Sequence, residues 1–175
     1  MCDFKSIRKA LQLLYLNGQD KKKITLLHCN TAYPTPLNDV NILTMNKLKK
    51  VFKVSSGYSD HAIGCEAVYA AVALGAIVIE KHVTLNKNLS GPDHKISLDF
   101  KEFKEMVNVI RNITKTLKNK KGKLTKSEKN NANLVKKYLV AKNFIKKGEK
   151  FSLKNLTAKR TGGGIESMKI NSILK

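Results

Sequence analysis

The chain of 175 residues is 42% hydrophobic, which suits one folded domain with a small appendage and argues against global disorder. Its 34 Lys and Arg against 13 Asp and Glu leave a formal net charge of +21. No apolar run is long enough for a transmembrane helix, the first residues do not resemble a signal peptide, and three separated cysteines exclude a disulfide scaffold, so we expect a cytoplasmic protein with no membrane partner.

Helix and strand patterns alternate through the first 98 residues. Helical spacing of apolar residues and short β-prone runs take turns over 7–14, 24–28, 38–51, 52–58, 63–74 and 76–79. Such alternation predicts βαβ units and a parallel sheet. An amphipathic helix follows from Asp99, and Asp99 with Glu102 three residues later predicts a capping box at its start.

The pattern changes after this helix. A polar stretch rich in Lys and Asn over 119–135 predicts a linker. Residues 136–175 then contain short β-like pieces, a KKGE turn and three consecutive glycines. We therefore expect a separate, compact and strand-rich module after the linker.

The basic excess is carried almost entirely by lysine, since Arg8, Arg111 and Arg160 are the only arginines. Interfaces with nucleic acid favour Arg, whose planar guanidinium pairs bidentately with phosphate and guanine. The charge therefore indicates a solvated lysine-rich surface and no nucleic-acid partner. A non-catalytic basic module that binds nucleic acid or acidic polysaccharide is one alternative, and an inert remnant is another.

Polar side chains follow the predicted strands at their C-terminal ends. The second strand runs into Ser-Asp-His, ending at His61, and the third into Glu-Lys-His, ending at His82. In parallel α/β folds these strand ends form one rim, where active sites gather. Adjacent strands lie about 4.8 Å apart, so two imidazoles at matching ends can share an ion. Two neutral nitrogens with open positions suit Mn²⁺, Co²⁺ or a similar ion, and we predict a divalent metal site there.

Four segments resemble the sialic acid synthase family in their order and spacing: LLHCNTAYPTPLNDVN, GYSDHAIG, AAVALGAIVIEKHVTL and GPDHKISLD. The stretch VAKNFIKKGEKFSLKNLTAKRTGGGI resembles the C-terminal antifreeze-like (SAF) domain of that family. The resemblance implies an α/β fold in which residues 1–118 form the last three strands of a (β/α)8 TIM barrel. It further implies a linker over 119–135 and a truncated, β-rich SAF domain over 136–175.

The resemblance also assigns roles to the positions that match the family motifs. It implies that His61 and His82 hold the metal, Mn²⁺ above all, and that Glu80 and Asp93 are catalytic. Arg160 is implied to reach into the site of the partner subunit and contact the N-acetyl group of the sugar. The substrate-binding residues that it implies are Thr31, Tyr33, Ser59, Glu80, Asp93 and Arg160.

Two departures from the family pattern concern loops. Ala32 stands where the family usually has an acidic or polar residue. The chain reads KRTGGG where the family usually reads KRPGNG, so Thr161 and Gly163 replace Pro and Asn. We expect this replacement to loosen the loop that aims Arg160.

The implied activity is condensation of phosphoenolpyruvate with an N-acetylated hexose, with release of phosphate. N-Acetylmannosamine, the precursor of N-acetylneuraminate, is the favoured sugar, and a legionaminic or pseudaminic acid synthase is the alternative. The full-length family is implied to form homodimers with swapped SAF domains. Because a barrel needs eight strands and three are predicted, we expect a fragment that is poorly soluble or oligomeric and inactive alone. A complementary N-terminal fragment is its expected partner.

Overall fold

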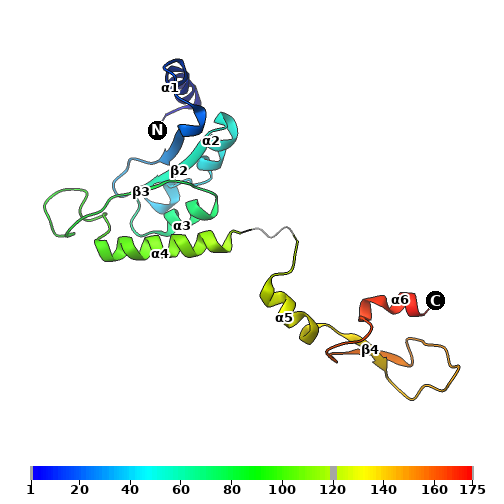
Figure 1. The fold of residues 1–175 in the computed structure, drawn as a ribbon. Coiled ribbons are helices and arrows are strands. Elements are labelled where there is room, and N and C mark those ends of the chain that lie inside the picture. Colours follow the sequence, from blue (N-terminus) through cyan, green and yellow to red (C-terminus); the bar gives the residue numbers. More distant parts are fainter. Residues whose placement is uncertain (1, 119–121, 175) are drawn as a thin grey trace. The chain divides into compact units, whose positions relative to one another are not determined.

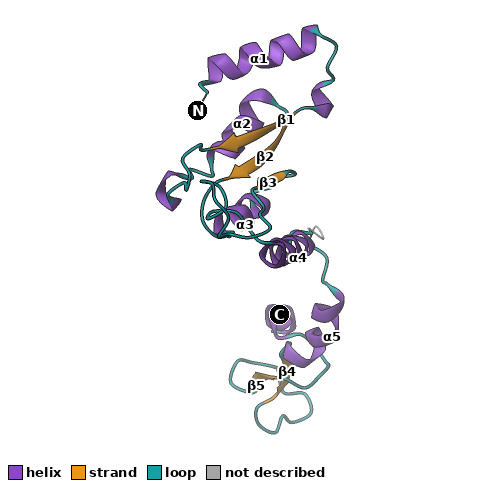
Figure 2. Ribbon diagram, turned by 90° about the vertical axis from the view of Figure 1, so that its left-hand side faces the viewer, coloured by secondary structure: helices purple, strands orange, loops and turns teal. Residues whose placement is uncertain are grey.

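The structure is a computed structural model that describes residues 2–118 and 122–174. It divides into two compact units, residues 1–118 and 119–175. Figure 1 follows the chain through its elements, and Figure 2 distinguishes helices from strands. The first unit is an α/β structure with a parallel sheet, as predicted, and the second contains an antiparallel strand pair.

The sheet of the first unit has three strands in the order β1-β2-β3, and both pairings are parallel. Its strands are β1 (Thr25–Cys29), β2 (Ser55–Asp60) and β3 (Ile79–Lys81). The βαβ pattern of the sequence is therefore confirmed. Since all three strands run in one direction, their carboxyl ends meet at one edge of the sheet, where the predicted polar residues lie.

Four helices accompany this sheet: α1 (Phe4–Leu16), α2 (Thr44–Phe52), α3 (Glu66–Ala73) and α4 (Phe100–Thr116). Short 3₁₀ turns at Lys21–Lys23 and Leu37–Asp39 precede β1 and α2. The Asp99 carboxylate accepts a hydrogen bond from the backbone N–H of Glu102, and the Glu102 carboxylate accepts one from the backbone N–H of Asp99. This confirms the predicted capping box. None of the described helices is long and apolar enough to cross a membrane.

All three strands begin later than the sequence predicts, β1 by only one residue, at Thr25. The expected strand over 52–58 begins at Ser55, because α2 continues to Phe52 and Lys53 then ends the helix with a left-handed backbone (φ 52°). The expected strand over 76–79 begins at Ile79. Its approach is already bonded to β2, since the Ile77 N–H donates to the carbonyl of Ser56.

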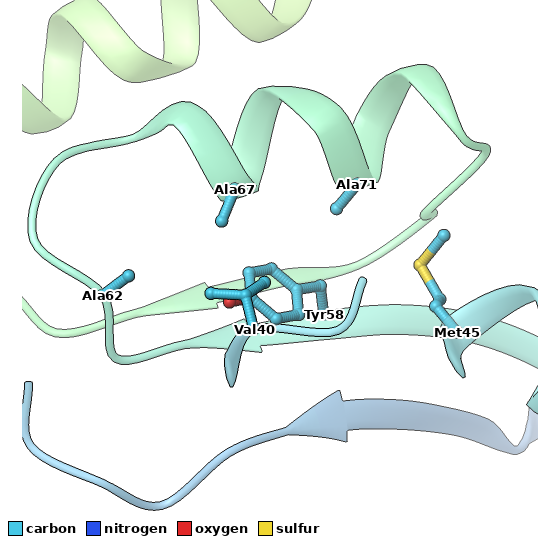
Figure 3. Close-up of a cluster of buried hydrophobic side chains, with 6 residues drawn as sticks. All are labelled: Val40, Met45, Tyr58, Ala62, Ala67 and Ala71. Atoms are coloured by element: carbon cyan, nitrogen blue, oxygen red, sulfur yellow. The ribbon is translucent and has the colours of Figure 1, made fainter. Parts of the chain in front are cut away.

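The core of the first unit lies between the sheet and its helices. Figure 3 shows the ring of Tyr58, on β2, facing α3, whose Ala67 and Ala71 point toward it. Small side chains on α3 allow this helix to approach the sheet closely. A second cluster joins α1 and α2 to β1, and a third joins α3 to α4 through Val68 and Met106.

The second unit consists of short elements: α5 (Lys126–Val135), β4 (Tyr138–Ala141), β5 (Leu156–Lys159) and α6 (Ile170–Ile173). The expected linker over 119–135 contains a helix that the sequence analysis did not predict, since residues 126–135 form α5. Thr125 explains the difference, because it forms a capping box with Glu128 at the start of α5. Residues 119–121 of the expected linker lie outside the described residues.

Candidate active site

His61 and His82 follow β2 and β3 directly, and their rings meet at the carboxyl edge of the sheet. The ring centroids lie 5.1 Å apart, with an angle of 72° between the planes. His61 is buried, whereas His82 is partly exposed. The fold thus brings together the two imidazoles that the sequence places at matching strand ends.

The hydrogen bonds of His61 fix its tautomer. Its Nδ1 lies 2.6 Å from the carbonyl oxygen of Asn30, which can only accept, so Nδ1 carries the proton. The lone pair therefore belongs to Nε2, which accepts from the Tyr33 hydroxyl at 2.9 Å. Histidines that bind metals commonly donate their second ring N–H to a backbone carbonyl in this way. His61 thus presents Nε2, the ring nitrogen that carries the lone pair, to the Tyr33 hydroxyl.

Tyr33 covers both imidazoles. Its ring centroid lies 4.2 Å from that of His61 and 5.6 Å from that of His82. Loss of hydration raises the pKa of the Tyr33 hydroxyl, and the nearby carboxylates of Asp93 and Glu80 raise it further. The phenol therefore stays protonated at neutral pH and donates to His61. Any ligand that binds the Nε2 atom must displace this hydroxyl, and the 46% exposure of Tyr33 leaves the side chain room to move.

Two carboxylates border the histidine pair. Asp93 Oδ2 lies 3.7 Å from His82 Nδ1, which places the GPD loop over the same rim. Glu80, next to His82 in sequence, accepts a hydrogen bond of 2.6 Å from the Ser59 hydroxyl. Ser59 and Glu80 are register partners on β2 and β3, so they face the same side of the sheet. A substrate that contacts both residues has to take the place of their mutual hydrogen bond.

The remaining residues singled out from the sequence lie elsewhere. Thr31 is exposed just after β1 and lines an apolar groove with His28 and Cys29. Arg160 belongs to the second unit, where it is exposed directly after β5. His28, the third histidine near the strand ends, contacts the carbonyl of Val40 through Nε2 and stacks on the buried ring of Tyr58.

The rim offers two imidazoles and a nearby carboxylate, the kinds of donor that an open divalent metal site uses. His61 and His82 offer two nitrogens, and Asp93 offers a carboxylate beside one of them. Within residues 2–118 and 122–174, no three His, Cys, Asp or Glu side chains lie close enough together to enclose a metal ion. Two imidazoles with positions left for water or substrate oxygens suit Mn²⁺, Co²⁺ and similar ions better than a closed structural zinc site.

Sequence reasoning missed the residues between the motif positions. Asp60 and Lys81 form an ion pair of 2.7 Å whose side chains are 0% and 1% exposed. Each stands inside a site motif, between Ser59 and His61 or between Glu80 and His82. The available signal was opposite charge at equivalent positions of two neighbouring strands, which predicts a cross-strand pair once the register is known.

Comparison with known proteins places the chain among sugar-acid synthases. The model of the NeuB family matches residues 1–122. An N,N′-diacetyllegionaminic acid synthase of Campylobacter jejuni is 51% identical over 174 residues, which cover 99% of this chain and 52% of that protein. A pseudaminic acid synthase of the same species is 44% identical over 142 residues, covering 81% of this chain and 41% of that protein.

The solved structures agree with the sequence matches. An N-acetylneuraminic acid synthetase from Leptospira borgpetersenii, crystallised with citrate, aligns with a TM-score of 0.67 and 33% identity. The alignment covers 75% of this chain and 45% of that one. The chain thus spans about half the length of the curated relatives and the structure that it matches.

Proposed function

The chain belongs to the NeuB family of sialic acid synthases, and from that premise we propose that it carries the sugar-binding and metal-binding part of a phosphoenolpyruvate-dependent synthase. In this reaction C3 of phosphoenolpyruvate attacks the aldehyde carbon of an N-acetylated hexose, water adds to the resulting cation, and phosphate leaves. The observation that carries the proposal is the His61–His82 pair, with ring centroids 5.1 Å apart beneath Tyr33.

The side chains of the rim divide the work of binding and orienting the substrates. A divalent ion on His61 and His82 would supply Lewis-acid polarisation of the sugar aldehyde. Asp93 and Glu80 accept hydrogen bonds from sugar hydroxyls and hold them in position for attack. Once its hydrogen bond to Glu80 is broken, the Ser59 hydroxyl donates a hydrogen bond to the phosphate of phosphoenolpyruvate. The protonated Tyr33 hydroxyl donates to a substrate oxygen once it leaves His61.

We propose a hexose with two acetamido groups as the preferred sugar, rather than the N-acetylmannosamine that the sequence motifs alone favoured. The support is the name of the relative that is 51% identical over 99% of this chain, an N,N′-diacetyllegionaminic acid synthase. The second relative, 44% identical, is likewise named for a product other than N-acetylneuraminate, namely pseudaminic acid. N-Acetylmannosamine is the reference substrate for the test.

The first unit is proposed to be the last three strands of a barrel. Three parallel strands with two outer edges, β1 and β3, resemble a segment cut from a closed parallel sheet. Apolar side chains border both edges, Leu26 and Leu27 along β1 and Ile77 and Ile79 along β3. We propose that a complementary N-terminal fragment covers these edges and brings the basic groups that hold phosphoenolpyruvate.

The second unit is proposed to be part of an SAF domain that presents Arg160 to the sugar of a partner subunit. Arg160 directly follows β5 and precedes a loop in which the Thr161 hydroxyl donates to the carbonyl of Gly163 at 2.7 Å. In a complemented enzyme, Arg160→Ala should raise KM for the sugar and leave KM for phosphoenolpyruvate nearly unchanged. Equal changes in both constants would contradict the arm.

Complementation tests the proposed function. The chain is mixed with the N-terminal segment of the C. jejuni N,N′-diacetyllegionaminic acid synthase that it does not match, and phosphate release is measured with Mn²⁺ and phosphoenolpyruvate. We expect release only when both pieces are present, faster with the doubly acetamidated hexose than with N-acetylmannosamine, and abolished by His61→Ala. A pair of pieces that co-purify without releasing phosphate would contradict the activity. Turnover on the order of 1 s⁻¹ by the chain alone would contradict the fragment proposal.

A further inference from the structure

A fully buried ion pair lies directly behind the candidate active site. Lys81 Nζ is 2.7 Å from Asp60 Oδ2, and the two side chains are 1% and 0% exposed. Asp60 and Lys81 are register partners on β2 and β3. Each immediately precedes one of the two site histidines, so the pair joins the ends of the strands that carry His61 and His82.

The carboxylate of Asp60 is surrounded by donors that fix the backbone around His61. Its Oδ1 accepts from the Tyr58 hydroxyl at 2.8 Å and from the backbone N–H of Ala62 at 3.1 Å. The second bond closes a turn with His61 at its centre, a typical use of an aspartate side chain. Lys81 Nζ also donates to the carbonyl of Ala62. One ammonium from β3 therefore holds both residues that flank His61.

The ion pair and the site occupy opposite faces of the sheet. Side chains alternate along a strand, so Asp60 shares the face of Tyr58, whereas Ser59 belongs to the other. Tyr58 faces α3, as Figure 3 shows, and its hydroxyl bonds to Asp60. On the opposite face, the Ser59 hydroxyl bonds to Glu80. The Asp60 and Lys81 side chains are therefore buried on the α3 side of the sheet, on the face opposite Ser59 and Glu80.

A buried ion pair is by itself weak evidence of a contribution to stability. Burying two charges removes their hydration, and apolar residues of similar volume often give an equally stable or more stable fold. Hydrogen bonds in a charged pair are directional, because each donor requires its acceptor at one place, whereas apolar packing has no such requirement. Such a pair is suited to fixing one backbone segment against another.

We propose that Asp60 and Lys81 are positioning residues that set the distance and angle between His61 and His82. The consequence for metal or substrate binding rests on the proposed function of the histidine pair, whereas the consequence for ring geometry does not. Without the pair, β3 keeps its backbone hydrogen bonds to β2 but loses the link to Ala62. The turn that carries His61 is then free to shift relative to His82.

The test compares three variants of the full chain. Asp60→Asn with Lys81→Met removes both charges together and so leaves no unpaired buried ion. Tyr58→Phe keeps the aromatic ring and removes only the hydroxyl that donates a hydrogen bond to Asp60. Lys136→Met is the matched control, because it breaks the exposed Lys136–Glu166 ion pair of the second unit. Circular dichroism verifies that each variant keeps its helical content.

Two measurements read the outcome. Magic-angle-spinning NMR of histidine-labelled chains, a method that tolerates oligomers, reports the contact between the His61 and His82 rings. The two other histidines are His28 and His94, whose Nδ1 lies 2.7 Å from the Thr84 hydroxyl oxygen, and their substitution by Gln assigns the signals. Titration with Co²⁺ alone reports the shared ion. We expect the double variant to lose the ring contact and to weaken Co²⁺ binding at least tenfold, Tyr58→Phe to weaken the contact less, and Lys136→Met to change neither.

A folded double variant that keeps the wild-type ring contact would overturn the proposal. If the double variant does not fold, Tyr58→Phe decides, and an unchanged ring contact in that variant would overturn the proposal as well. A wild-type chain with the ring contact but no Co²⁺ binding would contradict the proposed metal site and leave the positioning role standing. Failure of the two proposals is therefore distinguishable.

Discussion

Different interactions stabilise the two units of this chain. Among the described residues, every buried apolar side chain except Tyr138 lies in the first unit, where three clusters join the sheet to its helices. The second unit leaves large apolar side chains such as Phe144 and Met168 exposed at 86% and 90%. Its loops depend instead on hydrogen bonds from side chains to nearby backbone. The comparison indicates that the first unit contains most of the buried apolar core, whereas the second has little core of its own.

This difference extends to the candidate functional residues. The histidine pair of the first unit is fixed by strand register and by contacts between segments far apart in sequence, such as His61 with Asn30. Arg160 of the second unit sits beside a loop organised by contacts within a few residues, such as Thr161 with Gly163. Substitutions in the first unit should therefore destabilise segments far from the substituted residue, whereas those in the second should affect only neighbouring residues.

The largest expected effect comes from Asp60→Ala. This substitution leaves the ammonium of Lys81 buried without its carboxylate, which destabilises proteins by about 3–5 kcal/mol. Hydrogen exchange measured by mass spectrometry should show faster exchange throughout peptides of the first unit and little change in those of residues 122–174. Equal acceleration in both units would contradict their independence.

A smaller effect is expected from Asn155→Ala in the second unit. The Asn155 amide donates to the Glu149 carboxylate and to the carbonyl of Lys150, and its oxygen accepts from the Ser152 N–H. Removing it leaves backbone groups unpaired, at a loss of about 1–3 kcal/mol. Exchange should accelerate over 142–156 alone. Faster exchange in the first unit would show coupling that the comparison of the two units does not predict.

Loss of the capping box at α4 should lower the unfolding free energy by about 1 kcal/mol, measured as a lower urea midpoint for Asp99→Ala.

The same helix start carries a pH-dependent contribution. The hydrogen bond from Lys87, with that from the backbone of Asp99, lowers the pKa of the Glu102 carboxyl below its ordinary 4.5. Its contribution is fully present above that ordinary value and is lost as the pH falls through the lower folded value. The difference between wild type and Glu102→Gln should therefore shrink in acid, and a constant difference down to about pH 2 would contradict this.

The smallest effect is expected from Gly163→Asn, which restores the residue that the family pattern has at this position. An added Cβ at Gly163 meets no atom within 4 Å, and its backbone does not adopt a left-handed conformation. We expect a change in unfolding free energy within about 0.5 kcal/mol, as for other exposed sites. A larger loss, seen by urea unfolding, would contradict the open loop.

Much of the first unit could be predicted because short-range patterns and the sheet agree. The apolar runs of β1 to β3 and the capping pair Asp99 and Glu102 gave the order of elements and the shared edge of His61 and His82. The bounds of the elements were harder to predict. Nothing in the sequence before Lys53 distinguishes the last turn of α2 from the start of a strand. Only Lys53, with its left-handed backbone, separates them.

What the sequence could not give depends on tertiary contacts. The position of Tyr33 over both imidazoles requires the loop after β1 to return toward the sheet, where the Thr35 N–H donates to the carbonyl of His61. The Asp60–Lys81 pair requires the register of β2 against β3. In the second unit, α5 was missed because its polar residues hide a helix whose clearest signal is the capping pair Thr125 and Glu128.

The central claim is that His61 and His82 together form a divalent metal site at the strand ends. Titration of the chain with Mn²⁺, followed by electron paramagnetic resonance, tests it most directly, with His28→Ala and His94→Ala as matched controls from outside the pair. We predict one site per chain that is lost in His61→Ala and in His82→Ala and retained in both controls. Equal Mn²⁺ binding by the wild type and His61→Ala would contradict the claim.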